Sequence, residues 1–271
     1  MVLHVSTLRA RVAQVVRAKA LHTVRRCGQH GTLDCRYFFY DNNERKQSPW
    51  HHVPLFAGST TMQSLDACQP ALYYFVNEIP KGSRHKMEIA GDEAFNPIKQ
   101  DERKGVPRLY HSASLVNYGC LPQTWEDPRY VDEATKHGGD NDPIDVCEIG
   151  TRVAEVGAIY PVKVLGILGM IDSGETDWKV IAINANDPLA EQVNDLRDLH
   201  KTPLHDVVSQ VHRWFRDYKI PDGKPPSDFA FNGEAQPREF AVDVIQQTHE
   251  SWKQLTRNEA VGNPKLWTSV S

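Results

Sequence analysis

The stretch Gly138-Gly139-Asp140-Asn141-Asp142-Pro143-Ile144-Asp145-Val146 places three carboxylates within six residues, between two glycines and an apolar run. Side chains alternate in direction along an extended chain, so Asp140 and Asp142 are expected to face the same way. Pro143 bends the path, which brings Asp145 toward the same point. Clustered carboxylate oxygens repel one another unless hard cations such as Mg²⁺, Mn²⁺ or Ca²⁺ neutralise them. The stretch therefore predicts a divalent-metal site.

Two other interpretations of this stretch compete with a metal site. A solvated acidic turn without a metal fits the same composition. An EF-hand calcium loop does not fit, because its sixth position would be Asp145 instead of Gly and its twelfth would be Thr151 instead of Glu. Pro143 also breaks the EF-hand pattern.

The composition of the whole chain narrows the class of protein. Its 271 residues and net charge of -4 allow a sizeable core and argue against nucleic acid as the main partner. The five cysteines form no C-x-x-C pair, which indicates reduced thiols and not a disulfide frame or zinc site. No apolar run approaches the ~18 residues of a membrane span, so no membrane partner is expected.

The first 33 residues differ from the rest of the chain. They contain six basic residues and no acid, and Leu8, Val12, Val15 and Val16 share one helical face. These features are typical of an organellar presequence, although an ordinary basic helix or a disordered arm would share them. We therefore expect residues 1–33 to be a basic, targeting-like extension and residues 34–271 to form a single domain.

Short runs rich in aromatic and β-branched residues predict strands, and the glycines and prolines between them indicate a small barrel. The predicted strands are Asp34–Tyr40, Leu72–Ile79, Met87–Ile89, Asp145–Ile149, Tyr160–Leu168 and Trp178–Ile183. Helical spacing predicts two later helices. One ends near Tyr218 and buries Val207, Val211, Trp214 and Phe215, and one spans Phe240–Leu255 and buries Val242, Ile245, Thr248 and Trp252.

A second acidic cluster lies in the predicted hairpin Asp172-Ser173-Gly174-Glu175-Thr176-Asp177. Turn chemistry alone would explain it, but two acidic clusters at strand ends of one barrel, together with Glu88, are expected to surround several divalent ions. Basic residues lie in or beside the same segments: Lys86, Arg108, Lys179 and Lys219. Carboxylates, metals and cations in one site suit a highly charged anion such as a phosphate ester or anhydride.

These segments resemble family I soluble inorganic pyrophosphatases of the eukaryotic type. The resemblance extends from about Leu72 to Leu255 and rests on five motifs in the same order. They are Asn117-Tyr118-Gly119, Pro122-Gln123-Thr124-Trp125-Glu126-Asp127-Pro128, Asp140-Asn141-Asp142-Pro143-Ile144-Asp145-Val146, Gly174-Glu175-Thr176-Asp177-Trp178-Lys179-Val180 and Tyr218-Lys219-Ile220-Pro221-Asp222-Gly223-Lys224-Pro225.

The resemblance implies a mainly β, α+β fold with an OB-like five-stranded β-barrel, flanking helices and a site at the barrel mouth. It implies Mg²⁺-dependent hydrolysis of pyrophosphate by a metal-activated water, with Zn²⁺, Mn²⁺ or Co²⁺ as substitutes and Ca²⁺ as an inhibitor. By position, Asp140, Asp145 and Asp177 match the ligands of the tightest metals, and Glu88 and Asp172 match ligands of the metals that arrive with substrate. Asp142 matches the general base, Tyr118 matches a site tyrosine and Glu78 matches an acid behind the ligands. The residues that match phosphate-binding groups are Lys86, Arg108, Lys179, Tyr218 and Lys219.

The chain departs from that family at two places. The segment from Arg108 to Asn117 is several residues shorter, and Ser114 stands where the first tyrosine is expected, so one aromatic hydroxyl is missing unless Tyr110 replaces it. Pro80-Lys81-Gly82 stands in place of Pro-Arg-Trp. We expect a relaxed preference toward Zn²⁺ or tripolyphosphate, and a homo-oligomer formed through a different surface from the usual eukaryotic dimer.

Two other classes of function stay open from the sequence: a nucleic-acid-binding OB module and a non-catalytic metal-binding OB-fold protein. The basic N-terminus indicates a mitochondrion. The loop changes resemble the acidocalcisomal enzymes of trypanosomatids, and a cytoplasmic location also fits.

Overall fold

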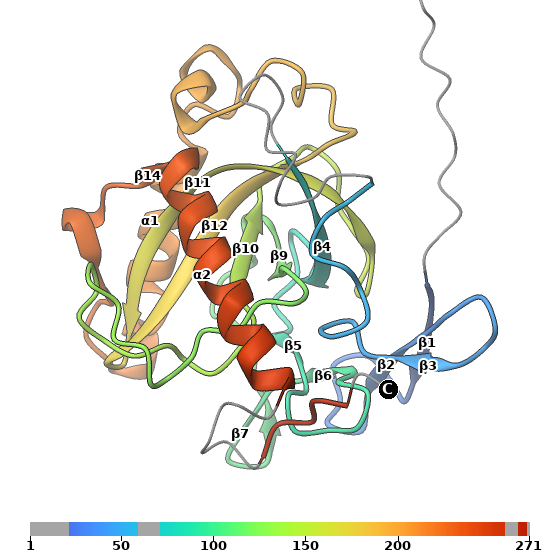
Figure 1. Ribbon diagram of the computed structural model, residues 1–271. Helices are drawn as coiled ribbons and strands as arrows, with labels where there is room; N and C mark the ends of the chain where they lie inside the picture. The colour runs from blue at the N-terminus through green and yellow to red at the C-terminus, as the bar shows by residue number, and fades with distance from the viewer. Residues whose placement is uncertain (1–21, 59–70, 258–264, 270–271) are drawn as a thin grey trace, which may run out of the picture.

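The computed structural model describes residues 22–58, 71–257 and 265–269 (Figure 1). Its centre is a closed ring of five strands in the order β12-β10-β9-β4-β11, in which β11 also pairs with β12. The strands are β4 (Leu72–Ile79), β9 (Asn117–Cys120), β10 (Asp145–Glu148), β11 (Ile159–Asp172) and β12 (Glu175–Asn184). The ring is mainly antiparallel, and β10 and β12 are parallel. The expected OB-like barrel is confirmed.

The strands that form the barrel were largely readable from their composition. Leu72–Ile79 has the bounds expected for it, β10 ends one residue earlier than expected, and β11 and β12 extend the two expected strands at their ends. β9 is not among the predicted strands. The extended ends of β11 and β12 meet in the turn Ser173-Gly174, where both residues have positive φ (56° and 90°). Such a turn suits the right-handed twist of a hairpin, and it sets two acidic residues beside the barrel mouth.

A second sheet lies beside the barrel and uses part of the basic N-terminal segment. Its order is β1-β2-β6-β5, with β3 paired to β2. Its strands are β1 (Thr23–Cys27), β2 (Arg36–Tyr40), β3 (Lys46–Gln47), β5 (Met87–Ile89) and β6 (Ile98–Gln100). Because β1 pairs with β2 along its whole length, the folded chain begins earlier than Asp34. The expected helical face at Leu8–Val16 lies outside the described residues.

Two helices cover the barrel, as expected. α1 (Val207–Asp217) buries Val211 and Phe215, which pack with β11 and β12 residues. α2 (Arg238–Thr256) crosses the barrel diagonally in Figure 1 and buries Ala241, Val244 and Ile245 against it. The buried face of α2 differs slightly from the expected one, since Val242 and Trp252 are only half-buried. No helix among the described residues is long and apolar enough to traverse a bilayer.

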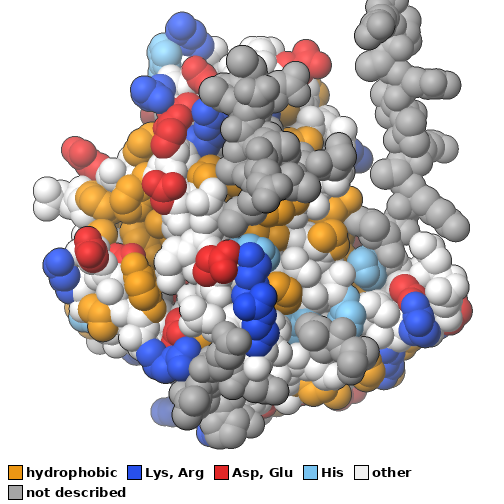
Figure 2. Space-filling model, in the orientation of Figure 1, with side chains coloured by type: hydrophobic (Ala, Val, Ile, Leu, Met, Phe, Trp, Pro, Cys, Tyr) orange, Lys and Arg blue, Asp and Glu red, His pale blue; other side chains and the backbone are white. Residues whose placement is uncertain are grey.

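The remaining elements are short. They are β7 (Glu102–Arg103), β8 (Val106–Pro107), β13 (Asp228–Phe229), β14 (Gln236–Pro237) and the 3-10 helices Leu196–Lys201, Ile220–Asp222 and Ala230–Gly233. On the face shown in Figure 2, basic and acidic side chains are interspersed among apolar ones. The four described cysteines, Cys27, Cys35, Cys120 and Cys147, are free thiols, and Cys68 lies outside the described residues.

Candidate active site

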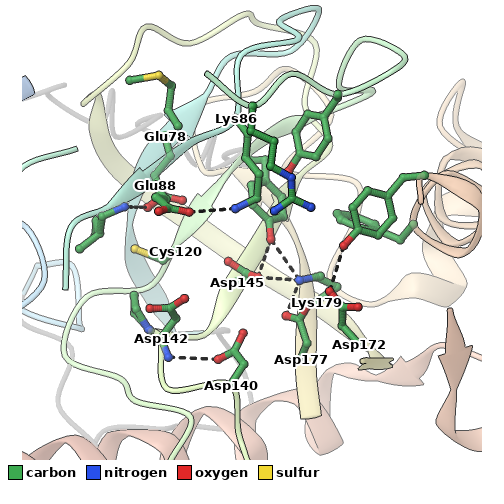
Figure 3. Close-up of a pocket in the computed structure, with 18 of the residues that line it drawn as sticks. Glu78, Lys86, Glu88, Cys120, Asp140, Asp142, Asp145, Asp172, Asp177 and Lys179 are labelled. Atoms are coloured by element: carbon green, nitrogen blue, oxygen red, sulfur yellow. Dashed lines mark hydrogen bonds and ion pairs between the residues drawn. The ribbon is translucent and has the colours of Figure 1, made fainter. Parts of the chain in front are cut away.

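A polar cavity of about 210 Å³ opens at the barrel mouth (Figure 3). It brings together residues that are up to 140 positions apart in the sequence, from β4, β5, β9, β10, β11, β12 and the end of α1. Of the expected site residues, those that line it are Glu78, Lys86, Glu88, Arg108, Tyr118, Asp140, Asp142, Asp145, Asp172, Asp177, Lys179 and Tyr218. Lys219 lies just behind and forms an ion pair with Asp172.

The acidic stretch forms a tight loop that leads into β10. Asn141 has a positive φ of 78°, and the backbone N–H of Asp142 donates to Oδ1 of Asp140 at 3.1 Å. A Cβ on Gly139 would lie 2.3 Å from the backbone of Glu126, so only glycine allows this approach. The loop is tied there by two backbone hydrogen bonds, from Glu126 N to Asp142 O and from Asn141 N to Glu126 O, both 2.9 Å. The expected convergence of the three aspartates is therefore produced by a rigid loop.

Lys179 is the cation nearest to these carboxylates. Its ammonium lies 2.6 Å from Asp145 Oδ2 and also donates to Asp177 and, at 3.0 Å, to the Tyr118 hydroxyl. Burial alone would lower the pKa of Lys179, but Asp145 and Asp177 raise it well above its ordinary value. The Tyr118 hydroxyl donates to Asp145, and burial together with Asp145 raises the tyrosine pKa. Lys179 is therefore a permanent positive charge on the cavity floor.

A second group of charges forms the opposite wall. Lys86 Nζ lies 2.9 Å from both Glu88 and Asp101, and Arg108 Nη1 lies 3.0 Å from Asp101. Burial would raise the pKa of Asp101, but Lys86 and Arg108 together lower it. The neighbouring Gln100 is buried and donates its side-chain amide to the backbone carbonyls of Lys86 (2.9 Å) and Arg108 (2.8 Å). Asp101 and Gln100 together place both cations.

A third group joins the β11–β12 hairpin to the end of α1. Tyr218 donates its hydroxyl to Asp172 at 2.9 Å, and Lys219 forms an ion pair with the same carboxylate. Burial would raise the pKa of Asp172, but the Lys219 ammonium outweighs it and lowers the pKa. Glu78 lies behind the opposite wall, where its Oε1 accepts the Ile89 N–H at 2.7 Å and so holds β5, the strand that carries Glu88.

The rest of the cavity has more negative than positive charge. Burial, followed by the charge of Asp177, raises the pKa of Asp140 well above normal. Burial and the charge of Glu88 raise the pKa of Asp142 to about 7, although its side chain is open to the cavity and solvent screens part of this shift. Burial also raises the pKa of Asp177 to about 7, against the opposing charge of Lys179. Two carboxylates near 5 Å apart repel by roughly 3–4 kcal/mol at an effective dielectric of about 20.

These carboxylates fit hard divalent cations. Oxygen atoms of Asp140, Asp177 and Glu126 lie within 4.8 Å of one another and are the donor type that Mg²⁺ and Mn²⁺ prefer. Figure 3 shows Asp140, Asp142, Asp145 and Asp177 around a common space, with Lys179 between Asp145 and Asp177. The site residues thus include an acidic cluster able to bind metal, enclosed by fixed cations.

Several residues of this site were not assigned from the sequence. Gln100 ends β6 and Asp101 follows it, and no sequence pattern predicts this strand, while Glu126 appears in the sequence only as part of a motif. Tyr110 was considered as a replacement for the missing tyrosine. It is buried and lines the cavity, whereas the Ser114 hydroxyl donates to the Val116 carbonyl at 2.7 Å. No sequence pattern around Gln100, Asp101 or Glu126 indicates their roles, because these roles arise from contacts between separate segments of the chain.

Known proteins of one family are similar to this chain over most of its length. The inorganic pyrophosphatase family model matches residues 75–253. The human inorganic pyrophosphatase is 45% identical over 236 residues, which cover 85% of this chain and 78% of the human protein. The structure of inorganic pyrophosphatase from Schistosoma japonicum matches with a TM-score of 0.83 and 44% identity over 92% of this chain and 86% of that chain.

A further solved structure is similar over nearly the whole chain. It is an N-terminal domain truncated vacuolar soluble pyrophosphatase from Trypanosoma cruzi in complex with PPi, with a TM-score of 0.82 and 42% identity. The match covers 94% of this chain and 100% of that chain. With a family match over more than half of its residues and relatives above 40% identity, the chain belongs to the inorganic pyrophosphatase family.

Proposed function

We propose that this protein hydrolyses inorganic pyrophosphate to two phosphates and depends on divalent metal, with Mg²⁺ as the cation used. The observation that carries the proposal is the single cavity in which Asp140, Asp142, Asp145 and Asp177 face fixed cations from two walls. A fully ionised pyrophosphate carries four negative charges. Such a ligand needs cations on several sides, and carboxylates alone would repel it.

The carboxylates divide into two proposed ligand groups. Asp140, Asp145 and Asp177 are the ligands for the tightest metals, and Glu88 and Asp172 are ligands for metals that arrive with substrate. Zn²⁺, Mn²⁺ or Co²⁺ would substitute for Mg²⁺, and Ca²⁺ would inhibit. When bound, divalent cations lower the pKa of a coordinated water toward neutrality and neutralise phosphate charge. Ion pairs of Glu88 with Lys86 and of Asp172 with Lys219 hold both outer carboxylates in place.

The chain's own residues perform the remaining steps. Asp142 faces the open cavity and accepts the proton of the attacking water, a contribution typically worth ~10²–10⁴ in rate. Lys86, Arg108 and Lys179 bind the phosphates, and Tyr218 with Lys219 stabilises the departing one. Tyr118 orients Asp145 through its hydrogen bond, and Glu78 holds β5 behind Glu88. Direct attack by water needs no covalent intermediate.

Phosphate release from pyrophosphate tests this function. We expect two phosphates per pyrophosphate with Mg²⁺, suppression by Ca²⁺ or fluoride, and no release in a chelator. Lack of release in Mg²⁺ by a folded protein would contradict the pyrophosphatase proposal and favour the non-catalytic metal-binding alternative. Tight binding of single-stranded DNA with a steep salt dependence would instead support the nucleic-acid module.

Tripolyphosphate hydrolysis is a second candidate activity, supported by the groove beside the cavity. This groove of about 530 Å³ shares Tyr110 and Tyr218 with the cavity and has Arg213 and His111 along it, where a third phosphate would extend. We expect release from tripolyphosphate, most visibly with Zn²⁺. Absence of release from tripolyphosphate with every metal would exclude this activity and leave the pyrophosphatase proposal standing.

We also propose a homo-oligomer formed through a surface other than the usual eukaryotic dimer contact. Val106, Leu109 and Leu115 are large apolar side chains exposed in one short stretch, at 58%, 44% and 37%. A mass above one chain in light scattering is expected, and Leu115→Asp should lower it. If the mass of Leu115→Asp equals that of the unchanged protein, Leu115 does not lie in the contact between subunits.

The proposed location is an organelle, either a mitochondrion or an acidocalcisome. The support is the basic, acid-free composition of residues 1–33. Since β1 belongs to the folded sheet, the segment proposed to direct the protein is 1–21. Imaging a tagged chain with and without residues 1–21 tests this, and an identical cytoplasmic pattern for both would contradict it.

A further inference from the structure

Glu126 is a buried acid that the roles above leave unexplained. It is 3% exposed and lies after β9, on the loop that faces the acidic stretch. Its Oε1 accepts the backbone N–H of Trp178 at 3.0 Å. Its Oε2 is buried and has no hydrogen-bond partner among the residues that the structure describes. A buried carboxylate oxygen without a partner is rare in folded proteins and calls for a ligand or a proton.

The surroundings of Glu126 indicate which ligand this would be. Oxygen atoms of Glu126, Asp140 and Asp177 lie within 4.8 Å of one another. Lys179 pairs with Asp177, but within the described ranges no Lys or Arg pairs with Glu126 or Asp140. Glu126 and Asp140 therefore lack the positive charge that Asp177 receives from Lys179.

The backbone of Glu126 makes this arrangement rigid. Its N–H and carbonyl both bond to the loop that carries Asp140 and Asp142, and its side chain bonds to the residue after Asp177. Glu126 is thus fixed to both chain segments that supply the other two carboxylates. If Glu126 had only a structural role, the hydrogen bond of its Oε1 to the Trp178 N–H would be sufficient. Its second carboxylate oxygen would then only destabilise the fold, because it lies close to the carboxylates of Asp140 and Asp177.

We propose that Glu126 is a further carboxylate ligand of the tightly held metals, where with Asp140 and Asp177 it binds a small, hard divalent ion such as Mg²⁺ or Mn²⁺. This inference rests on the proposed metal-dependent function and adds a residue to it. Glu126 sets how tightly the innermost ion is held and does not contact pyrophosphate. Its effect is therefore on metal affinity in the absence of substrate.

The test is Mn²⁺ and Mg²⁺ binding to Glu126→Gln by titration calorimetry without pyrophosphate. Glutamine keeps the acceptor for the Trp178 N–H and the side-chain shape but removes the charge. We expect affinity for the tightest ion to fall at least about tenfold, and the melting temperature in chelator to stay equal or rise. Glu133→Gln is the matched control, since Glu133 is an exposed acid on the same segment, and its affinity should equal that of the unchanged protein.

The outcomes separate the inference from the proposed function. Affinity of Glu126→Gln within twofold of the unchanged protein would overturn the inference while pyrophosphate hydrolysis stands. Absence of metal binding by the unchanged protein would overturn both. If Glu126→Gln fails to fold, Glu126→Asp replaces it, because it keeps the charge and withdraws the carboxylate by one methylene. Weaker binding by that variant supports the inference, and equal binding contradicts it.

Discussion

Lys179 of β12 and Asp145 of β10 are direct partners in the parallel pairing of these strands, and their side chains meet at 2.6 Å on the cavity floor. The register of the barrel therefore sets this ion pair. Lys179 is 2% exposed and also pairs with Asp177. One cation thus neutralises carboxylates from two strands before any metal is present.

Removal of Lys179 should destabilise the metal-free protein strongly. Lys179→Met leaves two largely buried carboxylates without their cation, and breaking a buried pair in this way typically costs about 3–5 kcal/mol. We expect that loss in urea unfolding with chelator and a partial recovery in Mg²⁺. The control is Lys253→Met, which removes a lysine from the surface pair with Glu250 and should cost about 1 kcal/mol or less. Equal losses for the two variants would contradict the proposed role of Lys179.

Asp142→Asn should abolish most turnover while leaving metal binding. The amide cannot accept the proton of the attacking water, so kcat should fall by ~10²–10⁴. Phosphate release measures the first effect and calorimetric Mg²⁺ titration the second. Full Mg²⁺-dependent turnover by Asp142→Asn would show that another group is the base.

The stability of the metal-free protein should depend on pH through Asp140. Its pKa is raised, by burial first, so in the folded state it keeps a proton that the unfolded chain has already lost. The contribution of Asp140 therefore lowers the free energy of unfolding as pH rises above about 4. Asp140→Asn should melt higher than the unchanged protein in chelator, by more at pH 8 than at pH 5.

Buried histidines with a lowered pKa make the protein more stable as pH rises, which is opposite to the effect of Asp140. The measured quantity is therefore the difference in melting temperature between Asp140→Asn and the unchanged protein. Burial lowers the pKa of His51 to about 4, for example, but this effect is the same in both proteins and cancels. The expected gain in melting temperature at pH 8 is more than about 2 °C, and saturating Mg²⁺ should reverse its sign. A gain that is equal at both pH values would refute the assignment.

Gln100 should act on the reaction without touching substrate. Gln100→Leu removes the amide that bonds the carbonyls of Lys86 and Arg108, which should cost about 1–3 kcal/mol of stability. Because both cations bind phosphate in our proposal, KM for pyrophosphate should rise more than kcat falls. Gln100→Asn should fail to restore KM, because its shorter side chain does not reach both carbonyls. A stability loss with unchanged KM would make Gln100 purely structural.

Local patterns in the sequence predicted four of the five barrel strands, all except β9, and the two acidic clusters of the site. The run Leu72–Ile79 and the acidic loop before β10 carry their own signals of alternation, aromatic content and charge. β1 lacked such a signal, since Thr23-Val24-Arg25-Arg26-Cys27 is mostly exposed and basic and is a strand only through pairing with β2. Glu126 and Gln100 acquire their roles from hydrogen bonds to the backbone of other segments, which no local pattern around either residue indicates.

In the proposed function, carboxylates from separate strands gather divalent ions at the barrel mouth. Anomalous diffraction from crystals soaked in Mn²⁺ measures this directly. We expect ion peaks within about 2.0–2.6 Å of oxygens of Asp140, Asp145 and Asp177. Peaks confined to other parts of the surface, in a protein that still releases phosphate with Mn²⁺, would contradict it.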